Sequence, residues 1–455
     1  MKEIVGIIIV LPLFTWVLTI RKNQDIVAPV NIFTFMYAIN IIIPTLLYMD
    51  TNTTGAISTA YIREAVLDDS TYITYVLLQT ACYYLVVFGT KLRLKTPLCE
   101  SDSYRSEETV VHEEVDLDEQ KRYKHIGVIL WVIGCFAFFE IMRQVGGVYY
   151  FFTHLQYRVS LTRNIDFLSW ILPMVNYGTL FIVYSLKGSN KSLNFKIIIL
   201  IVISGLMSGL GGRKSLIILL IEALLLYHYT VRPINIKRIL NVKYIAGLIV
   251  LYLFFILMTK FRTQGAFETF LENPISFVIE ANGGLLSTIR GESYVTYYMA
   301  IIYYFKSHAF WMGRTFIGLL TAFIPSSLYA NKFPVDDGTY LYSICQGRSD
   351  IIPPMAFNQL NGSSFPLETF GSMYGNFGII GLFIGMIILG GIYGYAYRKM
   401  KNKSYSLFTV VIYTQIMFTF ELSTLRIIQL LELMMMFWFI TFIGKSKIRI
   451  RGGTI

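Results

Sequence analysis

A glycine-rich stretch followed by two basic residues lies between two apolar segments of the chain. It reads Ser-Gly-Leu-Gly-Gly-Arg-Lys-Ser at 208–215. Glycines allow the backbone to approach a ligand closely, and the amides that open the next helix attract negative charge. Arg213 and Lys214 add two positive charges at the same place. The stretch therefore predicts an anion site, and a tight hairpin whose cations extend to the bilayer surface is the alternative.

Further arginines lie in the segments that join apolar stretches. Arginine suits phosphate because its planar guanidinium donates two parallel hydrogen bonds and keeps its charge. The other arginines that we predict to bind a phosphate group are Arg143, Arg158, Arg262, Arg290 and Arg314. The segment 143–166 also holds several aromatic residues, so a segment lying flat in the membrane interface is its alternative interpretation.

Three side chains in the long polar stretch 260–375 are suited to proton transfer. They are Glu292, His308 and Glu368, and carboxylates and imidazoles are common general bases. We rank Glu368 first among these candidate catalytic residues, because it lies where the chain returns to an apolar segment and an acid is costly there unless it is paired or hydrated. A helix cap or an ion pair is the alternative role for Glu368. The sequence contains no metal-ligand spacing, and we expect neither a metal nor another cofactor.

Apolar helices must hold these residues in place. The chain is 55% hydrophobic and 15% charged, whereas soluble domains carry about 25% charged residues. Apolar segments recur along the sequence, which predicts an all-α, polytopic transmembrane helical bundle of about 11–12 spans. The predicted spans are 4–20, 28–48, 71–90, 125–142, 167–186, 195–210, 215–230, 244–259, 377–396, 405–420 and 427–443.

The distribution of charge predicts the orientation of these spans. The positive-inside rule places the lysine-rich loops and the C-terminal tail in the cytoplasm. Residues 1–259 then form the first eight spans, and 377–455 the last three spans and a cytoplasmic tail. Between them, 260–376 forms one large extracytoplasmic loop that is partly helical, with a buried or re-entrant helix in the aromatic run 294–305. The net charge of +11 follows from this topology, so nucleic acid is not an expected partner.

Several short patterns together resemble those of the oligosaccharide repeat-unit polymerases, the Wzy-type O-antigen and capsule polymerases of bacteria. They are Gly-Gly-Arg at the outer hairpin, then Gly-Arg-Thr, Ile-Pro and Asn-Lys-Phe-Pro in the long loop, and Leu-Glu-Thr-Phe-Gly-Ser-Met-Tyr-Gly-Asn-Phe-Gly-Ile-Ile-Gly at its end. The last pattern contains Glu368, Tyr374, Asn376, Phe377, Gly378 and Gly381. The resemblance covers the span pattern of nearly the whole chain, whereas each residue pattern is loose by itself. The odd number of predicted spans departs from the even number that is frequent in the family.

The resemblance implies a fold like that of the lipid-dependent (GT-C-like) glycosyltransferases, and a metal-independent glycosyl transfer at the extracytoplasmic, periplasmic face of the bacterial cytoplasmic (inner) membrane. A growing glycan would move from undecaprenyl pyrophosphate to a hydroxyl of the next lipid-linked repeat unit, in the biosynthesis of O-antigen lipopolysaccharide or capsule. The implied partners are the undecaprenyl-pyrophosphate-linked oligosaccharide as donor and acceptor, membrane lipid, a chain-length regulator and the flippase. Tyr374 and Asn376 become substrate-binding candidates beside the arginines.

Two other functions stay open on the sequence. An O-antigen ligase would use the same donor with a different acceptor. A flippase or transporter of the lipid-linked unit would place charges at mid-membrane depth along a pathway. The predicted spans hold few charges and the outer loops hold many, which favours an enzyme.

Overall fold

The computed structural model describes residues 2–451 apart from 20–24, 26, 49–56, 58, 96–116, 163–165, 188–194, 232–248, 250–251, 255, 259, 291–292, 325–328, 330 and 349. The secondary structure of these described residues is helical, without a strand. An α-helix satisfies its backbone hydrogen bonds internally, which a segment in lipid requires. The all-α prediction is therefore confirmed for the described part of the chain.

Five helices in the described residues are long and apolar enough to cross a membrane. They are Pro29–Leu47, Asp69–Leu94, Asp118–Val145, Phe167–Tyr184 and Glu368–Asn402. The predicted spans 28–48, 71–90, 125–142, 167–186 and 377–396 fall on these helices. Shorter apolar helices cover Val5–Thr19, Phe195–Gly209 and Leu407–Phe418. The predicted span 244–259 lies largely outside the described residues, so the total number of spans stays a prediction.

Contacts divide the chain into two compact units. Unit 1 consists of Met1–Cys99, Ser287–Lys399 and Gln415–Ile455, and unit 2 of Glu100–Leu286 and Met400–Thr414. The division predicted from the sequence, at 259 and 376, follows the order of the chain. The contacts group the first three predicted spans with residues 287–376 of the predicted loop.

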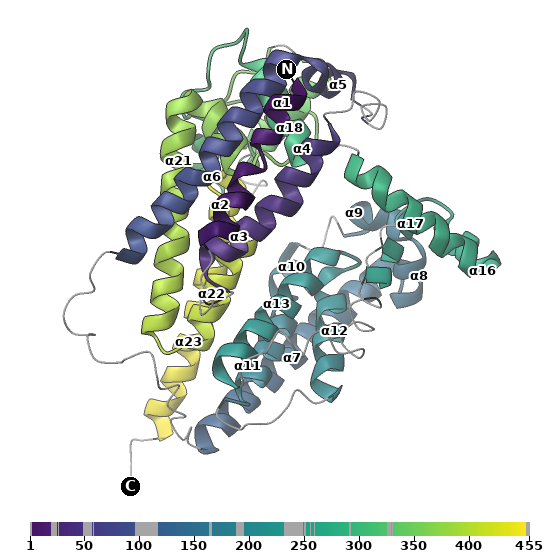
Figure 1. Cartoon of the computed structure of the whole chain (residues 1–455). Helices are drawn as coiled ribbons and strands as arrows, with labels where there is room; N and C mark the ends of the chain where they lie inside the picture. Colours follow the sequence, from purple (N-terminus) through teal and green to yellow (C-terminus); the bar gives the residue numbers. More distant parts are fainter. Residues whose placement is uncertain are drawn as a thin grey trace. The chain divides into compact units, whose positions relative to one another are not determined.

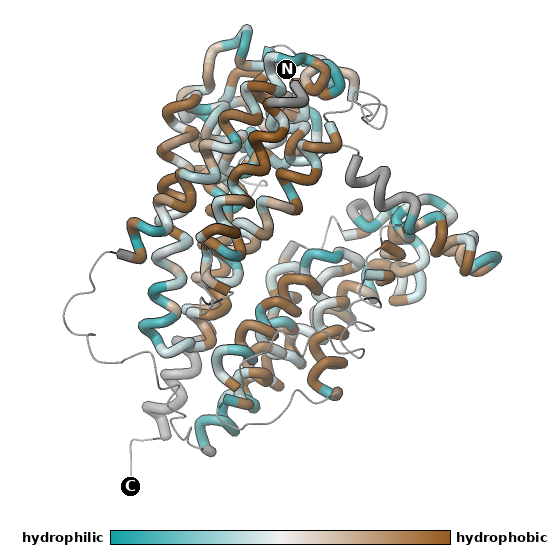
Figure 2. The backbone as a smooth tube through the Cα atoms, viewed as in Figure 1, coloured by the Kyte–Doolittle hydropathy of each residue, from teal (hydrophilic) through white to brown (hydrophobic). Residues whose placement is uncertain are grey.

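Unit 1 is built around two long helices, α6 (Asp69–Lys95) and most of α21 (Glu368–Asn402), which lie side by side (Figure 1). Hydrophobic residues follow both helices, and hydrophilic residues gather toward the C-terminal end of α21 (Figure 2). The other helices assigned to unit 1 are α1 (Lys2–Ile8), α2 (Leu11–Thr19), α3 (Pro29–Tyr37), η1 (Ala38–Ile42), α4 (Ile43–Leu47), α5 (Ala60–Leu67), α18 (Tyr294–Tyr304), η5 (Arg314–Phe316), α19 (Ile317–Thr321), α20 (Gly338–Cys345), η6 (Phe357–Gln359) and α23 (Thr424–Arg451).

The aromatic run after residue 293 forms a short helix inside unit 1. This helix, α18, has eleven residues, which is too short to cross a bilayer. Its N-terminus is held by the Ser293 amide, which donates to Thr296 Oγ1 at 2.9 Å. Its side chains from Val295 to Ile302 are buried against α5 and α6. The run is therefore a core element of unit 1.

The described part of unit 2 includes the helices α7 (Leu117–Val145), α11 (Met174–Tyr184), α12 (Phe195–Gly209), α13 (Arg213–Thr230) and most of α17 (Pro274–Arg290). Two polar contacts tie three of them together, because Ser204 Oγ accepts from Trp131 Nε1 at 3.0 Å and lies 2.7 Å from Thr179 Oγ1. The smaller elements are α8 (Val148–Thr153), η4 (Leu155–Tyr157), α9 (Arg158–Leu161), α10 (Asp166–Ile171) and α16 (Ala266–Glu272). Helix α22 (Leu407–Phe418) is divided between the two units.

Two glycines let α6 and α21 touch backbone to backbone. A Cβ on Gly89 would lie 2.2 Å from the carbonyl oxygen of Ile387, and a Cβ on Gly390 would lie 2.1 Å from that of Val86. Thr90 Oγ1 donates across the contact to the Gly390 carbonyl at 3.1 Å. Small residues at such contacts allow the close approach that stabilises helix pairs in membranes.

The replacement Gly89→Ala is expected to destabilise the protein, because its new methyl group overlaps backbone atoms that cannot rotate away. Overpacking of this kind costs about 1–3 kcal/mol, measurable as a lower thermal midpoint of the purified protein in detergent. Gly391→Ala is the matched control, since a Cβ there meets nothing within 4 Å. Equal midpoints for the two variants would show that α6 and α21 are not in this contact.

Candidate functional site

The glycine-rich stretch forms a tight turn between α12 and α13 of unit 2. Leu210 has φ +43° and Gly211 φ +75°, and the Gly212 amide donates to the Gly209 carbonyl at 2.6 Å. Gly212 is the N-cap of α13 and Arg213 its first residue. Because glycine has no side chain, it cannot cap the first amides of the helix. The sequence-based hairpin is thus present, with the N-terminus of a helix of eighteen residues at its end.

Two other arginines meet this turn, and we call Arg158, Arg213 and Arg262 the arginine cluster. Arg262 Nη2 donates to the Gly211 carbonyl at 2.7 Å. A Cβ added to Gly212 would lie 3.0 Å from Arg158 Nη1, so the absent side chain makes room for that guanidinium. Burial lowers the pKa of Arg262, and the positive charges of Arg158 and Arg213 lower it further. Three positive charges therefore gather where the sequence predicted an anion site.

Two nitrogen atoms of the arginine cluster are buried without a hydrogen-bond partner among the described residues. They are Arg158 Nη1 and Arg262 Nε. An unsatisfied buried donor costs about 1–3 kcal/mol, and more when it is charged. Such groups in a native protein call for an explanation, and a bound ion is one. An anion with several oxygen atoms would satisfy both nitrogens and offset the repulsion between the guanidinium groups.

The other basic residues predicted in unit 2, Arg143 and Lys214, have different surroundings. Arg143 forms an ion pair with Glu140 one turn earlier in α7, with 2.6 Å between Arg143 Nη2 and Glu140 Oε1. Lys214 is exposed, as the second residue of α13. Of the residues predicted from the sequence in this unit, the structure brings together Arg158, Arg213 and Arg262.

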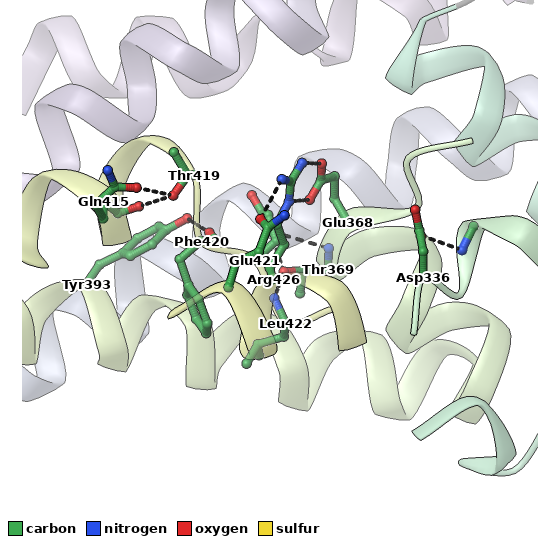
Figure 3. A network of polar contacts seen from close by, with 12 residues as sticks. Asp336, Glu368, Thr369, Tyr393, Gln415, Thr419, Phe420, Glu421, Leu422 and Arg426 are labelled. Carbon is green, nitrogen blue, oxygen red and sulfur yellow. Dashed lines mark hydrogen bonds and ion pairs between the residues drawn. The ribbon is translucent and has the colours of Figure 1, made fainter. Parts of the chain in front are cut away.

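Unit 1 holds a second polar group, the acid–arginine network of Glu368, Thr369, Glu421 and Arg426 (Figure 3). Arg426 donates from Nη2 to Glu368 Oε1 at 2.7 Å and from Nε to Glu368 Oε2 at 3.2 Å. The two side chains are 16% and 10% exposed, so the pair is largely shielded from water. The guanidinium of Arg426 thus donates to both carboxylate oxygens of Glu368. This is the ion-pair role that the sequence left as the alternative for Glu368.

Glu421 lies between α22 and α23 and contacts Thr369 at the start of α21. Its Oε2 atom accepts from the Thr369 hydroxyl and, at 3.3 Å, from the Thr369 amide. Burial raises the pKa of Glu421 to about 7, and the negative charge of Glu368 adds to this rise. The hydrogen bonds from Thr369 and the charge of Arg426 oppose it. This carboxyl group is therefore poised to exchange a proton near neutral pH.

A third carboxyl group of unit 1, Asp337, is 1% exposed and precedes α20. Its Oδ2 atom accepts from Ser372 Oγ. Burial raises the pKa of Asp337 to about 7 despite that hydrogen bond, and the charges of Asp336 and Glu368 add to the rise. With its side chain enclosed by protein, Asp337 serves to join α20 to α21.

Tyr374 and Asn376 are enclosed by protein, with 7% and 0% of their surfaces exposed. Asn376 Nδ2 donates to Thr315 Oγ1 and to the Ser372 carbonyl, each at 2.8 Å. The helix is broken next to it, because Gly378 has φ 65° and ψ −154°. The Gly375 and Asn376 carbonyls accept from Trp311 and Met312. In the described structure the Asn-Phe-Gly pattern thus docks the segment 311–315 onto α21.

His308 and Arg314 are both exposed. His308 stacks on Tyr304 with 4.0 Å between ring centroids, and its Nδ1 atom lies 2.9 Å from the Tyr304 carbonyl. Glu292 lies outside the described residues. Arg290 is the last residue of α17, and its side chain is likewise outside the description.

Sequence reasoning did not single out Glu421 and Arg426. The signal that could have found them is their position, an acid and an arginine within one short connection between two apolar segments. An intramembrane or near-membrane charge is a functional candidate by default. The partner Glu368 was found, but the sequence does not reveal which distant cation it meets.

No family model, no curated protein and no solved structure matches this chain.

Proposed function

We propose that this protein is a lipid-linked oligosaccharide repeat-unit polymerase of the bacterial cytoplasmic membrane. It would transfer a glycan from undecaprenyl pyrophosphate to a hydroxyl of the next lipid-linked unit, on the extracytoplasmic face. The five long apolar helices support a membrane protein. The resemblance of the sequence patterns supplies the reaction, and the orientation follows from the lysine-rich loops.

The observation that carries the proposal is the arginine cluster at the Gly209–Arg213 turn. It brings three guanidinium groups together. Two of their buried nitrogens, Arg158 Nη1 and Arg262 Nε, have no partner among the described residues. Such a cluster fits a ligand with more than one negative charge and several oxygens close together, as in a pyrophosphate. In the transfer, the bond from the anomeric carbon to pyrophosphate breaks and negative charge grows on the leaving oxygen. Fixed guanidinium groups stabilise that charge.

The test is reconstitution of the purified protein in vesicles with synthetic undecaprenyl-pyrophosphate-linked repeat units. A polymerase is expected to produce a ladder of products on a gel, each longer than the last by one repeat unit. Vesicles without the protein are the control and should keep the single unit.

The same experiment separates the alternatives. Transfer only when a lipid A core acceptor is added would identify a ligase. Movement of the lipid-linked unit across the bilayer without a new covalent bond would identify a flippase. Either result, without a ladder, would contradict the polymerase proposal.

A further inference from the structure

The two glutamates of the acid–arginine network differ in what occupies their oxygens. Arg426 holds both oxygens of Glu368. Glu421, in contrast, has contacts from Thr369 to Oε2 alone. No described residue donates a hydrogen bond to Oε1, and the Glu421 residue is half-buried and not fully enclosed. Glu421 therefore has one oxygen anchored by Thr369 and one oxygen that no described residue holds.

Thr369 fixes the direction of the anchoring hydrogen bond. The Leu422 amide donates to Thr369 Oγ1 at 2.8 Å, so the hydroxyl proton of Thr369 is left to point at Glu421 Oε2. Thr369 lies one residue into α21, next to Glu368. The Leu422 amide thus fixes the direction of the Thr369 hydroxyl, and this hydroxyl orients the Glu421 carboxylate. Such preorganisation is what a catalytic group needs.

The charges of α21 predict that the acid–arginine network lies at the extracytoplasmic end of this helix. Its opposite end carries Arg398, Lys399 and Lys401, which the positive-inside rule assigns to the cytoplasm. Glu368 begins the helix, and Glu421 contacts the residue that follows it. This is the membrane face at which the proposed transfer takes place.

We propose that Glu421 is the proton acceptor for the acceptor hydroxyl in the glycosyl transfer, with Thr369 as its positioning residue. This inference rests on the proposed function. The hydroxyl O–H bond breaks and its proton passes to Glu421 Oε1, while the hydroxyl oxygen forms a bond to the anomeric carbon. The bond from that carbon to the pyrophosphate oxygen breaks, and its electron pair leaves with undecaprenyl pyrophosphate. Glu421 then releases the proton to water.

Several titratable or charged groups surround Glu421 and set its behaviour with pH. Glu368 and Arg426 face it from α21 and α23. Three tyrosines also interact with its charge, namely Tyr294 and Tyr298 of α18 and Tyr393 of α21. The carboxyl must be ionised to accept a proton, and burial raises its pKa to about 7. Turnover should therefore fall as the pH drops through about 7.

The experiment measures polymer formed per minute from pH 5.5 to 9 (a range chosen to bracket about 7), with wild type and Glu421→Gln reconstituted in the same vesicles. Loss of a general base reduces turnover by about 100-fold or more, and the residual rate of Glu421→Gln should lose the acidic limb. Glu64→Gln is the control, an exposed acid of α5 in the same unit, and should keep both the rate and the limb.

A second pair of variants covers the case in which Glu421→Gln does not fold. Thr369→Val removes the hydroxyl that stabilises the Glu421 carboxylate, so the acidic limb should move to higher pH. Thr369→Ser keeps the hydroxyl and should keep the limb in place. An unmoved limb in Thr369→Val, or near-normal turnover with an unchanged limb in Glu421→Gln, would overturn the role of Glu421 while polymerase activity stands. Wild-type protein that builds no ladder would contradict the proposed function itself.

Discussion

The variant Arg158→Met is expected to lose pyrophosphate binding while unfolding at the same or a higher free energy than the wild type. Arg158 Nη1 is buried without a partner among the described residues and shares its surroundings with two other arginines. A hydrogen bond to a charged group contributes about 1.5–3 kcal/mol, and the bond that Arg158 Nη1 would donate to the ligand is lost. Methionine keeps an apolar stem in the place of the arginine stem. It removes the unpaired buried donor and the repulsion between the guanidinium groups, so the free energy of unfolding should rise by about 1 kcal/mol.

Binding of inorganic pyrophosphate to the purified protein, measured by titration calorimetry, and denaturant unfolding give the two readouts. Polymer formation should fall about 100- to 1000-fold, as when one donor to a developing negative charge is removed. Arg158→Lys should recover little, because an ammonium group lacks the planar fork.

Arg262→Met is the informative partner of this variant. Arg262 also donates to the Gly211 carbonyl, so its loss should weaken binding and destabilise the turn together. Arg122→Met, at an exposed position of α7, controls for the general loss of one positive charge. Unchanged pyrophosphate affinity in Arg158→Met would mean that the arginine cluster is not the anion site.

Arg426→Ala is expected to be the most destabilising single change in the acid–arginine network. It leaves the carboxylate of Glu368 largely buried and without its counterion. Removing one partner of a buried ion pair costs about 3–5 kcal/mol. The thermal midpoint of the purified protein should therefore fall well below that of the wild type at neutral pH.

The double variant Arg426→Met with Glu368→Met tests the origin of that loss. Replacing both charges by apolar side chains is often neutral or stabilising, so the double variant should regain most of the stability that Arg426→Ala loses. A double variant as unstable as Arg426→Ala would show that packing of the arginine stem, and not the unpaired charge, holds the helices together.

The helices could be predicted from the sequence because the signal is local. Runs of apolar residues identify a span without reference to anything else in the chain, and the five long helices lie on predicted spans. The Gly209–Arg213 turn was likewise predictable, since glycines and basic residues adjoin each other. The grouping of helices into units depends on which faces meet, and hydropathy does not encode it.

The partners of the site residues could not be predicted, because they are distant in sequence. Arg158 and Arg262 lie on either side of the turn in separate segments, and their residue type alone made them candidates. The position of Glu421 between two spans is a signal in the sequence, but its contact with Thr369, far away along the chain, is not. Asn376 belongs to a pattern, but its side chain is occupied within the protein by Thr315 and Ser372.

The break at Gly378 divides α21 into two parts that pack against different segments. The C-terminal part is fixed to α6 at Gly390, where backbones touch and cannot slide past each other without separating. The N-terminal part, from Glu368 to Phe377, is hydrogen-bonded instead to the segment 311–315. If the proposed transfer moves the N-terminal end of α21, we expect the helix to bend at Gly378, with the segment 311–315 following residues 368–377 while the C-terminal part stays packed against α6.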